Sequence, residues 1–154
     1  MAPFSVSNIV VAGSNLAYVA LAYWLVKRKF TLYAWILLFV AAVSSYFHLF
    51  PDSDSLLYFD IATAVLSSLV CFFHFLPYVK PSPIFVFTIA LITTATLLWL
   101  QSGEDRECSK YIWFHSAWHV MTALSLYLLI KSTDLKSGNG AWNYPILTGG
   151  KQSI

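Results

Sequence analysis

The stretch TLYAWILLFVAAVSSYFHLF, residues 31–50, decides the fold of this chain. It contains no Asp, Glu, Lys or Arg, and its length matches the roughly 20 residues that an α-helix needs to cross the core of a bilayer. Lipid offers the backbone no hydrogen-bond partners, so a helix is the structure expected for such a segment. Basic residues 27–29 precede it and Pro51 follows it, which defines both ends of the predicted span.

The composition of the whole chain agrees with this stretch. Of its 154 residues 58% are hydrophobic and only 10% are charged, whereas soluble domains average about 25% charged residues. A soluble fold of this size could not bury so much apolar side chain. The net charge of +2 is too small to indicate a nucleic-acid partner. We therefore predict an all-α, polytopic transmembrane helix bundle.

Five apolar segments predict about five spans, namely residues 8–26, 31–50, 56–76, 83–100 and 110–130. They form one transmembrane domain, residues 1–131, followed by a polar tail, residues 132–154, that we expect to be flexible. The first span lacks a preceding basic region and a cleavage site, so it is expected to be a retained helix rather than a signal peptide.

The basic residues of the loops predict the orientation. Seven of them fall on one side of the predicted spans: Lys27, Arg28, Lys29, Lys80, Lys131, Lys136 and Lys151. Only Arg106 and Lys110 fall on the other side. The positive-inside rule then places the C-terminal tail in the cytoplasm and the N-terminus outside or in a lumen. No sorting motif indicates which membrane holds the chain.

Ionisable residues inside the spans are functional candidates, because charge in a bilayer is costly. Most of them belong to one shallow layer near the outer face: His48, Asp60, His115 and His119, joined by Ser44 one turn from His48. His74 is 14 residues beyond Asp60, roughly 21 Å along the helix, and is therefore expected near the opposite face.

Three histidines in one layer predict a metal site. His115 and His119 have i, i+4 spacing and share one helix face, and His48 would supply a third nitrogen. Three histidines leave a fourth tetrahedral position for water, the pattern of a catalytic zinc. Asp60 could then accept a proton or hold a histidine tautomer, and Ser44 could orient water or stabilise an oxyanion.

Simpler interpretations exist for each residue alone. One His-x-x-x-His pair is a weak motif, and an intramembrane carboxyl such as Asp60 can simply bond a neighbouring hydroxyl. Ser44 could be a small packing residue, and His48 could meet lipid headgroups. Haem held by two histidines is a further alternative, although two histidines on one helix face suit it poorly. The joint pattern favours the metal site.

The ordered set of motifs resembles a known family. Ser44-Ser-Tyr-Phe-His48, then Asp60, then His115-Ser-Ala-Trp-His119 is similar to the signature of the CREST superfamily of membrane hydrolases, which includes alkaline ceramidases and adiponectin and progestin receptors. The segment from Tyr111 to His119 looks closest to the branch of myomaker and the GPI-specific phospholipase A2. The resemblance covers roughly half the chain.

This resemblance implies Zn²⁺ held by His48, His115 and His119, with Ser44 and Asp60 as the accompanying residues. Ser45 is less suitable than Ser44, because it precedes His48 by three positions rather than four. The implied activity is hydrolysis of an amide or ester bond in a membrane lipid. The alternative is a receptor, scaffold or fusion-type protein with a structural zinc.

The chain departs from the family in its number of spans. The family typically has seven, with three between the aspartate helix and the last helix, where this chain has one. Loss of two spans keeps the site residues at one face but thins the wall around them. The chain could be a short variant or a truncated gene product, or a second copy of it could complete the bundle.

These hypotheses carry geometric expectations. The ligating nitrogens of the three histidines should lie within roughly 3.5 Å of one another. The helices that carry His48, Asp60 and His115 should be mutual neighbours, with the 83–100 helix packed outside them. An apolar cavity should open from the vacant coordination position toward lipid or the outer leaflet, because a lipid substrate would enter laterally.

Overall fold

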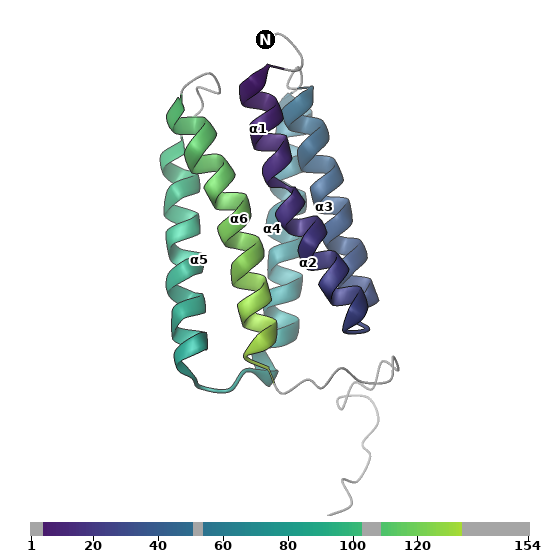
Figure 1. Ribbon diagram of the computed structural model, residues 1–154, viewed down its shortest axis with the longest axis vertical. Helices are drawn as coiled ribbons and strands as arrows, with labels where there is room; N and C mark the ends of the chain where they lie inside the picture. Colours follow the sequence, from purple (N-terminus) through teal and green to yellow (C-terminus); the bar gives the residue numbers. More distant parts are fainter. Residues whose placement is uncertain (1–4, 51–53, 103–108, 134–154) are drawn as a thin grey trace, which may run out of the picture.

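The chain folds into a bundle of helices (Figure 1). The structure, a computed structural model, describes residues 5–50, 54–102 and 109–133, with the side chains of residues 54–57 outside the described part. Its elements are α1 (Val6–Ser14), α2 (Leu16–Lys27), α3 (Thr31–Leu49), α4 (Asp54–Phe75), the short 3-10 helix η1 (Leu76–Tyr78), α5 (Pro83–Ser102) and α6 (Ser109–Lys131). The predicted all-α bundle is confirmed, and the predicted ends of the last four segments lie within two residues of the observed helix ends.

Four of the helical segments are long and apolar enough to cross a membrane: residues 6–27, 31–49, 58–78 and 83–102. The fifth, α6, has 23 residues and is equally long, but it is more polar. Its polar residues include His115 and His119, and both are buried inside the bundle. The polarity of α6 therefore reflects the groups that it presents to the other helices.

The predicted span over residues 8–26 lies within one apolar helical segment, residues 6–27, that is interrupted at a single residue. α1 ends at Ser14, Asn15 forms a turn, and α2 begins at Leu16. The Ser14 hydroxyl donates a hydrogen bond to the Val11 carbonyl at 2.6 Å, and the Asn15 N–H bonds to Ala12 instead of continuing the helical pattern. Gly and Ser side by side, as at Gly13-Ser14, are a common cause of helix kinks.

α6 holds the central position in the bundle. α1, α2, α4 and α5 all pack against it, and α1, α2 and α4 also pack against α3 (Figure 1). Within the described residues, α5 packs mainly on α6 and has little contact with α4. The expectation that the helices of His48, Asp60 and His115 are all mutual neighbours was therefore only partly right. α4 packs against α3 and α6, whereas α1 packs between those two.

The apolar core lies toward the end of the bundle at which α2 and α6 finish. Its most buried side chains include Leu25, Phe75 and Leu129. At the same end, the Lys80 N–H donates to the Ser132 carbonyl at 3.2 Å and Val79 pairs with Thr133. These contacts bring the α4–α5 connection against the end of α6, so Lys27, Lys80 and Lys131 share one end of the bundle. The predicted tail from residue 134 onward lies outside the described residues.

Candidate metal centre

Three histidines meet at the other end of the bundle from this core. His48 near the end of α3 and His115 and His119 on α6 are all buried, and their candidate ligand nitrogens lie within 4.8 Å of one another. The ring centroid of His48 is 4.9 Å from that of His115 and 5.5 Å from that of His119. The two α6 rings are 4.9 Å apart. The structure thus brings together the three residues predicted as metal ligands.

Helix geometry explains how each ring reaches the cluster. One helical turn separates His115 from His119, so both project from one side of α6. His48 is in the last turn of α3, and its ring approaches the pair edge-on, with interplanar angles of 77° to His115 and 55° to His119. Aromatic side chains pack against these rings. Tyr111 stacks on His115 with ring centroids 4.8 Å apart. The ring centroid of Trp118 is 5.0 Å from that of His115 and 4.8 Å from that of His119.

His119 has a partner that the sequence analysis missed. The Ser14 hydroxyl oxygen lies 2.7 Å from Nδ1 of His119, although the two residues are 105 positions apart. Ser14 stands at the break between α1 and α2, the helices that pack directly against α6. A serine in an apolar run is an ordinary packing residue at sequence level, so no motif singled it out.

The neighbouring residues Ser44 and Ser45 differ in the hydrogen bonds of their hydroxyls. Ser44 is buried on α3, one turn before His48, and its hydroxyl makes no hydrogen bond within the described part of the chain. Ser45 accepts a hydrogen bond from the Asn15 amide at 3.3 Å and donates to the Ala12 carbonyl at 3.4 Å. Ser45 therefore ties α3 to the helix break, and Ser44 keeps a hydroxyl available on the face of α3 that carries His48.

Asp60 lies outside the histidine group. It is buried on α4 and close enough to Tyr18 of α2 to interact with it electrostatically. Tyr18 shares a hydrogen bond with the Thr122 side chain, and its ring centroid is 6.1 Å from that of His119. Tyr18, a residue absent from the sequence-based site, therefore lies near His119 and feels the charge of Asp60. The predicted catalytic role of Asp60 stays a prediction.

His74 lies away from the cluster, as predicted. Its ring centroid is 4.8 Å from that of Tyr33, at the beginning of α3, whereas His48 is at the end of the same helix. His74 also contacts Phe75 and Tyr78 near the end of α4. It belongs to the end of the bundle that carries Lys27, Lys80 and Lys131.

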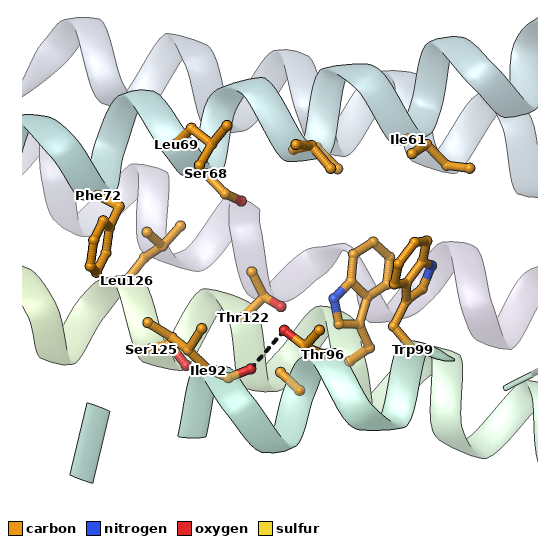
Figure 2. Close-up of a pocket in the computed structure, with 14 residues that line it drawn as sticks. Ile61, Ser68, Leu69, Phe72, Ile92, Thr96, Trp99, Thr122, Ser125 and Leu126 are labelled. Atoms are coloured by element: carbon orange, nitrogen blue, oxygen red, sulfur yellow. Dashed lines mark hydrogen bonds between the residues drawn. The ribbon is translucent and has the colours of Figure 1, made fainter. Parts of the chain in front are cut away.

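A cavity of about 360 Å³ lies between α4 and α5 and is closed on one side by α6 (Figure 2). Its lining is mostly apolar, with Ile61 and Phe72 from α4 and Ile92 and Trp99 from α5 among the contributors. α6 contributes Thr122, Ser125, Leu126 and Trp118. Trp118 also contacts two of the histidines, so the cavity lies beside the candidate metal centre. None of the three histidines lines it, so the predicted opening from the metal position into the cavity stays a prediction.

The donor set fits a small metal ion. Nε2 of His119 is buried and has no hydrogen-bond partner among the described residues, although a buried ring nitrogen normally has one. Tetrahedral zinc with Zn–N bonds of 2.0–2.1 Å places its nitrogens about 3.4 Å apart. In the structure the candidate ligand nitrogens lie within 4.8 Å of one another, which is wider than this spacing. Small side-chain rotations would bring the nitrogens to the distances that zinc requires. The three rings contact one another, which favours a single ion over haem.

Comparison with known proteins identifies no relative. No family model, curated protein or solved structure matches this chain.

Proposed function

We propose that the chain is a zinc-dependent intramembrane hydrolase that acts on an amide or ester bond of a membrane lipid. The observation that carries the proposal is the group of three buried histidines, with ligand nitrogens within 4.8 Å of one another, in a bundle rich in apolar spans. Histidine nitrogens are typical zinc ligands, and three of them leave one coordination position open. The order of motifs similar to that of the CREST superfamily supports the same function.

Zinc bound by three histidines supplies a Lewis acid and lowers the pKa of a bound water. The residues around the histidines supply the other requirements of hydrolysis. Asp60 is a buried carboxylate within reach of Tyr18 and is the candidate proton acceptor. The Ser44 hydroxyl is the candidate hydrogen-bond donor to the substrate carbonyl. Tyr111 and Trp118 cover His115 and limit the access of bulk water.

The cavity between α4 and α5 supports a lipid as the substrate. It is lined mainly by apolar side chains, lies within the membrane-spanning part of the bundle and adjoins the histidines through Trp118. A hydrocarbon chain in the cavity would leave a polar headgroup at the end of the bundle where the histidines lie. Entry between α4 and α5 would be lateral, from the bilayer, because these two helices have little contact with each other.

Metal analysis of the purified full chain tests the proposal. We expect about one zinc per chain in the wild type and a large loss of zinc in His48→Ala, His115→Ala and His119→Ala. His74→Ala is the matched control and should keep its zinc, because His74 lies at the other end of the bundle. A wild-type protein that binds no zinc after incubation with the metal would rule out the proposed function.

A non-enzymatic role is the second candidate, and one observation favours it. Asp60 lies outside the histidine group, so the site holds a metal-binding set without a carboxylate among the ligands. The chain would then be a membrane receptor, scaffold or fusion-type protein with a structural zinc. A second copy packed along the α4–α5 side would complete the bundle in that case. Cross-linking in intact membranes tests this partner, and an exclusively monomeric chain would contradict it.

A further inference from the structure

The break between α1 and α2 places one hydroxyl against a candidate metal ligand. The Ser14 oxygen is 2.7 Å from Nδ1 of His119 and 2.6 Å from the Val11 carbonyl oxygen. Both distances are typical of strong hydrogen bonds. The Ser14 hydroxyl has a single hydrogen, so it donates to only one of these two atoms.

The Val11 carbonyl determines the direction of these bonds. A carbonyl oxygen only accepts, so the hydroxyl hydrogen of Ser14 points to Val11. The Ser14 oxygen then accepts a hydrogen bond from Nδ1–H of His119. Since Nε2 has no hydrogen-bond partner in the described residues, the ring proton belongs on Nδ1.

The opposite tautomer would be unfavourable. If Nε2 carried the proton, a buried N–H would lie among the other two imidazoles with no acceptor in the described part of the chain. A buried donor without a partner costs about 1–3 kcal/mol. With the proton on Nδ1, the lone pair of Nε2 faces His48 and His115, which is the arrangement that a metal ion requires.

We propose that Ser14 is a positioning residue that holds His119 as the Nδ1–H tautomer, with Nε2 directed into the three-histidine centre. The helix break is the structural element that makes this contact possible. Asn15, which is buried, anchors the break to α3 through Ser45, next to Ser44. The N-terminal span is therefore part of the site, although it carries none of the metal ligands. This inference rests on the proposed metal centre only for its effect on zinc affinity.

The tautomer is tested without metal. The full chain, labelled with ¹⁵N in its histidines and stripped of metal, is studied in detergent micelles by NMR, which distinguishes the two imidazole tautomers. His119 is assigned by the loss of its resonances in His119→Gln. We expect a single Nδ1–H tautomer in the wild type and a mixture in Ser14→Ala. Ser14→Thr, which keeps the hydroxyl, should restore the single tautomer. A wild-type His119 protonated on Nε2 would overturn the proposal.

Zinc affinity, measured by competition with a chelator, provides the second readout. Ser14→Ala should weaken zinc binding about 10- to 100-fold, as expected when the hydrogen-bond partner of a ligand is lost. Ser14→Thr should restore it. Ser132→Ala is the matched control, because the Ser132 hydroxyl also bonds the carbonyl three residues earlier at 2.6 Å but lies at the other end of the bundle.

The two readouts separate the possible failures. Equal zinc affinities for Ser14→Ala and Ser132→Ala would show that Ser14 does not position the ligand. A wild type that has the Nδ1–H tautomer but binds no zinc would refute the metal centre and leave the Ser14 contact in place. If Ser14→Ala does not fold, the wild-type tautomer and the Ser14→Thr variant still decide the question.

Discussion

Asp60 is the only acidic residue whose side chain the structure describes, and it is buried. A buried carboxylate in a membrane bundle is costly and indicates a function or a specific partner. Its electrostatic interaction with Tyr18 connects it to Thr122 and, through the tyrosine ring, to His119. At the scale of single residues, a change of Asp60 distinguishes an enzyme from a protein that only binds metal.

We expect Asp60→Asn to retain zinc and to lose hydrolysis. Zinc binding should persist because Asp60 is not a member of the histidine group. Hydrolysis should fall about 100-fold or more, as is typical when a general acid or base is removed. The measurement is turnover of a panel of labelled ceramides, phospholipids and GPI lipids by the purified variant, beside its zinc content. Wild-type activity that exceeds background and is fully retained in Asp60→Asn would refute the catalytic role.

Among the elements, α4 and α5 have little contact with each other in the described part of the chain. Both pack on α6, and a cavity lies between them. Helix pairs in lipid are held together by close packing and polar contacts rather than by the hydrophobic effect. The space between α4 and α5 can therefore stay open to lipid.

Filling this space should reduce turnover without disturbing the metal. Ala64 of α4 lines the cavity, whereas Ala62, two residues earlier, is exposed on the outside of the same helix. We expect Ala64→Trp to lower hydrolysis of long-chain substrates about 10-fold or more, because the indole would occupy volume needed by the chain. Ala62→Trp should have little effect. Equal activities of the two variants at equal zinc content would mean that the cavity does not hold the substrate.

In the described part of the molecule, five of the six basic residues lie at one end of the long axis, and Lys110 lies at the other. Lys27, Arg28 and Lys29 follow α2, and Lys80 and Lys131 lie at the same end, whereas the three histidines lie at the other. Exposed side chains along the helices include many large apolar ones, such as Trp35 and Val86. An apolar middle with basic residues at one end is the pattern of a membrane protein whose basic end faces the cytoplasm.

We therefore expect the histidine end and the N-terminus to face the lumen or the outside. A glycosylation acceptor attached to the N-terminus through a polar spacer should be glycosylated in microsomes, and one attached to the C-terminus should not. Replacing Lys27, Arg28 and Lys29 by Gln should produce a mixture of orientations, since these residues contribute most of the basic charge of that end in the described part of the chain. Glycosylation of the C-terminal acceptor alone would reverse the proposed topology.

The sequence by itself determined the long helices and the end of the bundle at which the three histidines lie. Apolar length is a local property, and in lipid a helix is the only way for such a segment to satisfy its backbone, so residues 31–50 predicted α3 to within one residue. The i, i+4 spacing placed His115 and His119 on one face of α6, and the alternation of helix direction brought His48 to the same end. The three histidines could therefore be selected without a structure.

Only the tertiary structure decided which helices surround those histidines. The placement of α1 between α3 and α6, and with it the contact between Ser14 and His119, joins residues that are 105 positions apart. The same packing left Asp60 outside the histidine group and brought the Tyr18 ring near that of His119. The physical reason is that in lipid all apolar helix faces are nearly equivalent, so partner choice depends on the fit of small and polar side chains across helices. The hydrophobic periodicity of a single segment does not predict that fit.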